Sequence, residues 1–578
     1  MTYRPPLDDI AFALAYQADL DELGSWYAGG GQVDTAMTMD LLTEAGRFVA
    51  DVFAPLRRIG DEQPARRHDD GTVTTAPGTP AAYRQFVDAG WAGVSFPEAW
   101  GGGGQPWVTT IAVQEMITSA SMGLSLCPLL TQGAIELLLH HASEEQKSVY
   151  LPKMITGEWT GTMNLTEPDA GSDVGALRAK AARVDDGTYR ISGTKIFITF
   201  GEHDLTDNII HLVLARTPDA PPGTKGISVF IVPKFLVNDD GSLGSRNAAT
   251  CLKLEHKVGI HASPTCVMEF DEAVGYLIGD ECTGMRSMFT MMNNARLSVG
   301  LEGLSLTEAA YQHALDYARL RRQGRAVGAP PGTSSPIIEH TDVRVMLATM
   351  KANIDAMRGL LYFDAAHVDR AMTHPDESER RAAGDLVALL TPVCKAWSTD
   401  LGVEMTSLGI QVHGGMGFVE ETGAAQFWRD SRIAPIYEGT NGIQAIDLVT
   451  RKLPLDDGAT LDGLLARVRR EAGETSALVA VEEATAYMRA ALAAGRVNDA
   501  LAGATPYLRM VGTLLGDWML QRSATVARGA IAAGASNADY LGERLAIADF
   551  YRTRILPTTL GLSAASMAGA TGLDLLLR

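Results

Sequence analysis

Apolar residues follow alternating helical and strand-like patterns along this chain. Across residues 7–157 they recur at helical intervals, and Ser143 followed by Gln146 has the spacing of a capping box that opens a helix. Across residues 159–279 the apolar runs become short and β-rich. This change predicts a helical segment followed by a β-domain.

Turn signals separate the expected strands of the β-domain. Asp185-Asp186-Gly187 and Pro221-Pro222-Gly223 are sequences that favour tight turns. The runs expected to form strands lie at residues 189–198, 211–215, 227–232 and 265–270.

Helical periodicity returns after the β-domain and continues to about residue 453, with a loop expected at Ala329–Ser335. Beyond Pro454 the chain is rich in Ala and Leu and again has helical spacing. Four segments result, at residues 1–158, 159–280, 281–453 and 454–578.

Composition agrees with a globular protein of several domains. The chain has 578 residues, of which 46% are hydrophobic and 20% charged, and its net charge is −20. An acidic chain repels polyanions, which argues against broad binding to nucleic acid. Five cysteines without a CxxC motif predict neither a disulfide framework nor a metal site. We see no signal peptide and no apolar run of membrane-spanning length, so we expect a cytoplasmic protein.

Four ordered motifs carry the candidate chemistry. They are Leu165–Asp173 (LTEPDAGSD), Gly193–Thr199 (GTKIFIT), Gln411–Gly417 (QVHGGMG) and Ile436–Thr440 (IYEGT). Together they resemble the acyl-CoA dehydrogenase family of flavoproteins, and the resemblance covers about residues 82–453.

The resemblance implies both a fold and a reaction. The fold class is α+β and mostly α, with an N-terminal helical domain, a middle β-barrel-like domain and a C-terminal four-helix bundle. Residues 454–578 add a further helical domain. The reaction is FAD-dependent α,β-dehydrogenation of an acyl-CoA to the trans-2-enoyl-CoA, which needs a general base at Cα and a hydride acceptor at Cβ. In the family, flavin N5 accepts that hydride.

Glu438 in the IYEGT motif is the expected base. A carboxylate in an apolar cleft has a raised pKa, which suits proton abstraction near neutral pH. Some family members carry the base on the helix through Arg296, but the matching position here is Ala295. Taken alone, a glutamate at position 438 would more often be a solvated loop residue, and the IYEGT motif reverses that expectation.

The resemblance also implies a set of flavin contacts. Thr166 and Thr199 read otherwise as ordinary strand residues, and Arg321 as one more exposed base; in the family this Arg reaches the flavin of a neighbouring subunit. Gly324 stands where that family has Phe, which departs from the pattern. The residues expected to bind FAD are Met163, Leu165, Thr166, Ser172, Phe197, Thr199, Arg321, Gln323, Gly414, Gly415 and Thr440.

The expected substrate contacts are Ser172, Arg296, Tyr437 and Gly439. Arg296 could position the base or could instead make an intrahelical salt bridge. We expect His413 to be structural, held by hydrogen bonds.

Several features resemble a branch of long bacterial acyl-CoA dehydrogenases. They include the Glu255–Ser263 run and the C-terminal extension. That branch contains broad-range fatty acyl-CoA enzymes of actinobacteria and 3-methylmercaptopropionyl-CoA dehydrogenases. It implies an electron-transfer flavoprotein as electron acceptor and a homo-oligomer, for which we favour a dimer. The alternatives are an acyl-CoA oxidase that uses oxygen and a non-enzymatic nucleic-acid-binding relative on the same scaffold.

Overall fold

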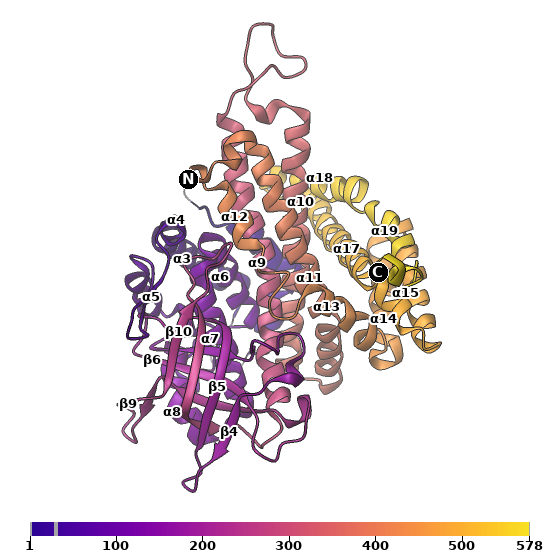
Figure 1. Ribbon diagram of the computed structural model, residues 1–578. Coiled ribbons are helices and arrows are strands. Elements are labelled where there is room, and N and C mark those ends of the chain that lie inside the picture. Colours follow the sequence, from indigo (N-terminus) through magenta and orange to yellow (C-terminus); the bar gives the residue numbers. More distant parts are fainter. Residues whose placement is uncertain (1–2, 28–32, 577–578) are drawn as a thin grey trace.

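The computed structural model describes residues 3–27 and 33–576. Helices dominate this part of the chain, and the main sheet lies at the lower left of the molecule, below the N-terminal helices and beside the long central helices (Figure 1). The predicted α+β class with a mostly helical chain is therefore confirmed.

The N-terminal region is helical, as its periodicity predicted. The expected capping box is present, because Ser143 accepts from the Gln146 backbone and the Gln146 side chain accepts from the Ser143 backbone. The elements are α1 (Leu7–Ala13), α2 (Leu20–Gly24), α3 (Thr35–Phe48), α4 (Leu56–Glu62), β1 (Arg66–Arg67), β2 (Val73–Thr74), α5 (Thr79–Asp88), α6 (Trp107–Ala120), α7 (Met122–His141) and α8 (Glu144–Thr156).

Helix α7 corrects the expectation that no apolar run reaches membrane-spanning length. By length and composition its 20 residues could cross a membrane, but 83% of the apolar stretch of this helix is buried inside the protein. A buried apolar helix of this kind is typical of a protein core, and α7 packs against α9 (Gly284–Leu320).

The middle region forms a seven-stranded sheet in the order β3-β6-β7-β11-β5-β4, with β10 paired to β11. β3 and β6 are parallel, and the other neighbours are antiparallel. A bridge between Lys180 and Arg216 brings β4 to the end of β6, which gives the sheet its barrel-like form. The strands are β3 (Trp159–Asn164), β4 (Lys180–Arg183), β5 (Tyr189–Thr199), β6 (Asn208–Ala215), β7 (Ser228–Pro233), β8 (Phe235–Val237), β9 (Leu243–Arg246), β10 (Ala249–Leu254) and β11 (Thr265–Leu277).

Three long helices form the centre of the molecule (Figure 1). They are α9, α10 (Thr341–Thr373) and α11 (Glu377–His413), and they are followed by the short helices α12 (Ala424–Ser431) and α13 (Asn441–Asp447). The α9–α10 connection contains the predicted loop and projects beyond the ends of both helices (Figure 1).

The C-terminal helices pack on the side of this bundle away from the β-domain (Figure 1). Trp397 of α11 is buried against Gly512, where an added Cβ would lie 2.3 Å from Cγ of the indole. One apolar core therefore continues from the bundle into this region. Its helices are α14 (Ala459–Ala472), α15 (Ser476–Ala493), α16 (Val497–Ala502), α17 (Ala504–Ala532), α18 (Ala538–Phe550), α19 (Thr558–Ser566) and α20 (Leu573–Leu576).

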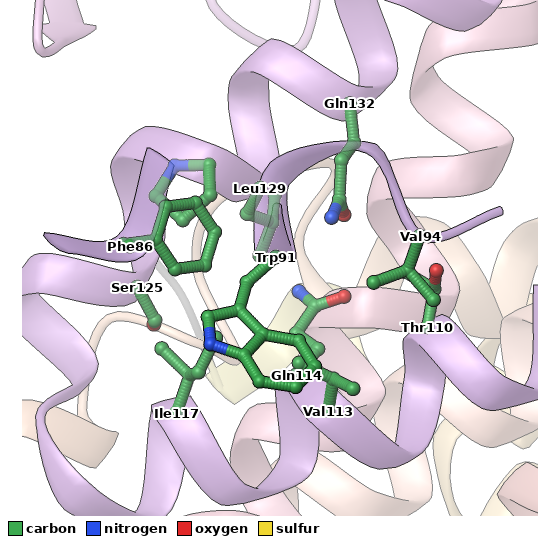
Figure 2. Close-up of a pocket in the computed structure, with 11 residues that line it drawn as sticks. Phe86, Trp91, Val94, Thr110, Val113, Gln114, Ile117, Ser125, Leu129 and Gln132 are labelled. Carbon is green, nitrogen blue, oxygen red and sulfur yellow. The ribbon is translucent and has the colours of Figure 1, made fainter. Parts of the chain in front are cut away.

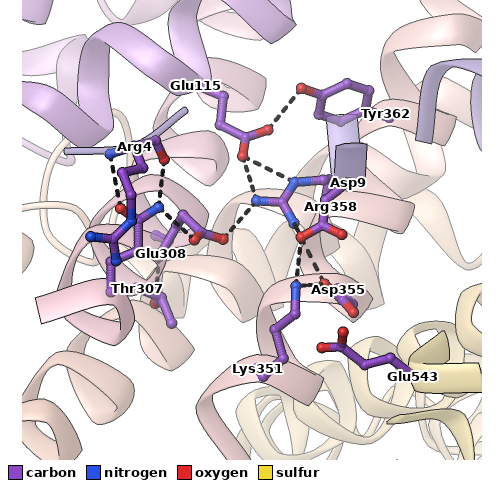
Figure 3. A network of polar contacts seen from close by, with 12 residues as sticks. Arg4, Asp9, Glu115, Thr307, Glu308, Lys351, Asp355, Arg358, Tyr362 and Glu543 are labelled. Carbon is purple, nitrogen blue, oxygen red and sulfur yellow. Dashed lines mark hydrogen bonds and ion pairs between the residues drawn. The ribbon is translucent and has the colours of Figure 1, made fainter. Parts of the chain in front are cut away.

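A buried network of charges ties the N-terminus to the bundle (Figure 3). Nη2 of Arg358 lies 2.6 Å from a carboxylate oxygen of Glu115 and 2.9 Å from one of Glu308. Nζ of Lys351 lies 2.6 Å from Asp9. These pairs connect α1, α6, α9 and α10, so the first helix is fixed to the centre of the fold.

Candidate active site

Glu438 lies in the turn between α12 and α13 with an unusual backbone. Its φ is 55°, and that of the following Gly439 is 83°. A left-handed conformation is unfavourable for a residue with a side chain and persists where neighbouring contacts enforce it. Such strain at a predicted base is itself a sign of a functional turn.

Three side chains hold the turn through its backbone carbonyls. Nε of Arg296 donates to the Glu438 carbonyl at 3.4 Å. Nζ of Lys395 donates to the Gly439 carbonyl at 2.9 Å, and Nε2 of Gln444 donates to the same oxygen at 3.2 Å. Arg296 thus makes the loop contact, which was one of its two expected roles.

The pKa of Glu438 is raised, as predicted. Burial is the main cause, and the charges of Arg296 and Lys395 oppose it. The surroundings are less apolar than the sequence indicated, because Ile436 is half exposed and cations lie near the carboxyl.

Two buried charged residues that the sequence analysis did not single out lie behind this turn. The Tyr437 hydroxyl donates to Glu302, 2.5 Å from both carboxylate oxygens. Glu302 and Lys395 are both fully buried. Burial raises the pKa of Glu302 to about 8 and lowers the pKa of Lys395 to about 8. A charged residue inside an otherwise apolar stretch of helix is the signal that could have identified them.

The first motif forms the edge of the β-domain. The Ile196 backbone donates to the Thr166 carbonyl at 2.9 Å. Buried Lys195 donates to the Leu165 carbonyl at 3.1 Å and to Glu167 at 2.7 Å. The segment after β3 is therefore fastened to β5, which brings the first two motifs together.

Phe197 presents its ring to the outside of β5. It is 60% exposed and has a φ of 60°, next to a shift in the pairing register of β5 and β11. Thr199 follows at the end of the same strand, where it pairs with Thr265. A large exposed aromatic ring in a strained strand is a ready surface for a planar ligand.

The turn containing Glu438 is linked to this edge through α12. The Ile260 backbone donates to Asp430 in α12 at 2.5 Å. Residue 260 lies five positions before Thr265, and α12 directly precedes the Glu438 turn. This hydrogen bond fixes α12, and with it the Glu438 turn, relative to the edge of the β-domain.

Other predicted contacts lie elsewhere in the chain. Arg321 and Gln323 are exposed beyond the end of α9, at a distance of about 37 Å along the helix from Arg296. Gly414 and Gly415 follow α11 and are also exposed, with nothing within 4 Å of an added Cβ. One chain does not bring these four residues to Glu438.

The remaining predicted residues have local roles. Met163 lies in β3, and Ser172 lies in the exposed segment that follows it. The Thr440 hydroxyl accepts from the Ile443 backbone at 3.2 Å and so caps α13. The cap fixes the end of the Glu438 turn.

His413 is buried, and the expected hydrogen bonding is met at one ring nitrogen only, because its Nε2 has no hydrogen-bond partner among the described residues. Its Nδ1 bonds to the Gly409 carbonyl at 2.7 Å. Its ring stacks on His313 and Tyr317 with centroid separations of 4.6 and 4.5 Å. Burial lowers its pKa, which favours the neutral ring.

Two cavities lie apart from Glu438. Figure 2 shows Gln114 and Gln132 among apolar side chains of a pocket of about 10 Å³, which is barely enough space to hold one water. A larger cavity of about 560 Å³ is lined by Asn294. Asn294 and Arg296 point about 160° apart on α9, so this cavity opens on the face opposite the Glu438 turn.

Comparison with known proteins identifies the family. The domain descriptions that match are "Acyl-CoA dehydrogenase, N-terminal domain" at residues 35–158, "Acyl-CoA dehydrogenase, middle domain" at 162–273, "Acyl-CoA dehydrogenase, C-terminal domain" at 283–453 and "Acetyl-CoA dehydrogenase C-terminal like" at 466–575. The chain belongs to the acyl-CoA dehydrogenase family.

Individual relatives cover almost the whole chain. It is 46% identical to 3-methylmercaptopropionyl-CoA dehydrogenase of Ruegeria pomeroyi over 96% of each chain. It is 33% identical to the broad-specificity linear acyl-CoA dehydrogenase FadE5 of Mycobacterium tuberculosis, again over 96% of each. A solved acyl-CoA dehydrogenase from Bacillus anthracis, complexed with FAD, shares the fold with a TM-score of 0.74 at 19% identity, covering 96% of this chain and 91% of that one.

Proposed function

We propose that this chain dehydrogenates acyl-CoA thioesters to trans-2-enoyl-CoA products with FAD as cofactor and Glu438 as base. The observation that carries the proposal is the Glu438 turn. Its carboxyl has a raised pKa, and Arg296 and Lys395 hold the turn through the backbone carbonyls of Glu438 and Gly439. The raised pKa brings the carboxylate closer to the basicity that Cα proton removal near neutral pH requires.

The β-domain edge fits a flavin. Phe197 offers an open aromatic face, and the Thr166 and Thr199 hydroxyls lie on the two segments that Lys195 and Ile196 fasten together. Met163, Leu165 and Ser172 belong to the same edge. When bound, FAD supplies the acceptor for the hydride that leaves Cβ.

The chain's own residues provide the proton chemistry. Glu438 takes the Cα proton onto a carboxylate oxygen, and Arg296 keeps Glu438 in position by donating to its backbone carbonyl. Ser172, Tyr437 and Gly439 remain the proposed substrate contacts. The Tyr437 hydroxyl is engaged by Glu302, so this residue would meet the substrate through its ring or backbone.

An acyl-CoA panel tests the function. Purified protein would be mixed anaerobically with linear saturated acyl-CoAs of increasing length and with 3-methylmercaptopropionyl-CoA, and loss of flavin absorbance would be followed. E438Q should keep FAD and lose at least about 100-fold in bleaching rate. Wild-type bleaching by E438Q would refute the base, and no bleaching with any acyl-CoA would refute the reaction.

We further propose electron-transfer flavoprotein as the electron acceptor. The exposed Phe197 edge supports this, because it leaves the proposed flavin site accessible to a second protein. Turnover that generates peroxide at the same rate without that acceptor would instead indicate an oxidase.

We also propose a homodimer. Arg321, Gln323, Gly414 and Gly415 are exposed and far from Glu438 within one chain, which supports a role at the flavin of a second copy. Sedimentation of the FAD-loaded protein tests this, and a monomer or a clean tetramer would contradict it.

A cytoplasmic location completes the proposal. All five cysteines are free, and four of them are buried, which is usual for a reducing compartment.

A further inference from the structure

The strained turn at Glu438 requires supports that lie behind it. Two successive residues have left-handed backbone, and only the second is glycine. Such a conformation relaxes unless surrounding contacts over-determine it. The residues that enforce it are therefore as important to the geometry as the base.

Glu302 holds one side of the turn. It lies on α9, is fully buried, and both of its carboxylate oxygens lie 2.5 Å from the Tyr437 hydroxyl. Tyr437 immediately precedes Glu438, so this contact fixes the chain as it enters the base.

Lys395 holds the other side. It lies on α11, is fully buried, and donates to the Gly439 carbonyl at 2.9 Å and to Oδ1 of Asn441 at 2.8 Å. Asn441 is the first residue of α13 and also donates to Asp400 at 2.7 Å. The chain leaving Glu438 is thus fixed to α11.

We propose that Glu302 and Lys395 are positioning residues that clamp Tyr437 and Gly439 on either side of Glu438 and so keep the base in its strained conformation. This inference rests on the proposed function of Glu438. Arg296 and Gln444 also hold the turn, but Glu302 and Lys395 differ from them because each carries a titrating charge that acts on the other.

The charges around the clamp link it to pH. Glu302 faces the Tyr437 hydroxyl and the charges of Lys395 and Glu438. Lys395 faces Glu302, Glu438, Asp400 and Arg296. Both pKa values are about 8, so the charge beside Glu438 changes in the range where the enzyme would work.

Hydrogen exchange and flavin reduction together test the clamp in the FAD-loaded, full-length protein. In E302L and K395M, backbone amides of residues 433–444 should exchange at least tenfold faster. The limiting rate of flavin reduction by octanoyl-CoA, or by the best acyl-CoA of the panel, should fall at least tenfold. The dissociation constant of that acyl-CoA should change by a smaller factor than the reduction rate, because Tyr437 and Gly439 supply only part of the proposed substrate contacts whereas reduction depends on Glu438.

Conservative variants separate positioning from charge. E302Q keeps a partner for Tyr437, so its exchange should match wild type, while the pH profile of reduction should change above pH 7. K395R keeps a donor and should recover most of the rate lost in K395M. K351M is the matched control, since Lys351 is another buried lysine with two carboxylate partners, and exchange at 433–444 should stay at the wild-type level.

The outcomes are decisive in either direction. Wild-type exchange and wild-type reduction in both E302L and K395M would overturn the clamp. If those variants lose FAD, Y437F decides, because without the hydroxyl the same amides must exchange at least threefold faster. If no acyl-CoA reduces the wild-type flavin, the proposed function fails, while the exchange measurement still decides the clamp.

Discussion

Nη1 of Arg544 in α18 lies 2.7 Å from Oδ2 of Asp355 in α10, and both side chains are 6% exposed. The same nitrogen lies 3.0 Å from Asp9 of α1. A residue of the C-terminal region therefore joins the buried charge network of the bundle and the N-terminus.

Removing this cation should destabilise the protein strongly. R544M leaves Asp355 and Asp9 with fewer partners in a buried site, so the free energy of unfolding should fall by about 3–5 kcal/mol. Urea denaturation of the FAD-loaded protein measures it. R496A breaks an exposed pair with Asp499 and should cost under about 1 kcal/mol. Equal effects of the two substitutions would contradict a structural role for the network.

The raised pKa of Glu438 predicts how flavin reduction depends on pH. The base must be deprotonated, so the limiting rate should rise with pH as Glu438 loses its proton. The rise in rate should occur above pH 4.5, the ordinary pKa of a glutamate, because burial raises the pKa of Glu438. Anaerobic stopped-flow measurement between pH 4.5 and 9 checks this. A rate that is already maximal at pH 4.5 would contradict the assignment.

Gly439 should tolerate no side chain. Its φ is 83°, and an added Cβ would lie 2.7 Å from Nε2 of Gln444, which holds the turn. G439A should cost about 1–2 kcal/mol and slow flavin reduction about tenfold. G463A in α14 is the control, because nothing lies within 4 Å of its added Cβ and a helical alanine should stabilise by up to about 1 kcal/mol. An unchanged rate in G439A would argue against a strained base.

His261 should stabilise the fold mainly at low pH. The hydrogen bond that its Nδ1 donates to the Asp61 carboxylate, at 2.8 Å, raises the pKa of His261. A raised folded-state pKa means that the stabilisation is complete below pH 6.5, the unfolded value, and is lost as pH rises through the folded value.

H261Q should therefore lose more stability at pH 5.5 than at pH 8.5, as measured by urea denaturation at both values. H68Q, at an exposed histidine that bonds to the neutral Thr74 hydroxyl, provides the comparison. A larger loss at pH 8.5 would reverse the predicted sign.

Local patterns were enough to predict most of the elements. The strand runs of the β-domain and the Ser143 capping box depend on residues close together in sequence, and the structure contains them. The helical spacing expected beyond Pro454 is present as well, and the buried face of α14 consists of Leu461, Leu464, Leu465 and Val468. The apolar length of α7 exceeds the sequence expectation, because Thr131 and Gln132 interrupt the apolar run and yet are both buried.

The site was predictable only where a short motif contains it. Glu438 and Phe197 lie in compact motifs, whereas the clamp from Glu302 and Lys395 forms only when α9 and α11 pack together. Neither residue has a distinctive sequence neighbour, so no local pattern indicates that they meet one turn. The exposed positions of Arg321 and Gly414 follow from helix length, which the motif spacing does not reveal.

The contact between Trp397 and Gly512 joins the central bundle to the C-terminal helices, so the two cannot be separated without exposing the indole. The indole is buried by α17, although the recognisable motifs end before residue 453. A shortened chain that stops there would expose a large aromatic surface to water and would tend to aggregate. The segment beyond residue 453 therefore covers an apolar face of the bundle, and we expect a chain that lacks this segment to be less soluble than the full-length protein.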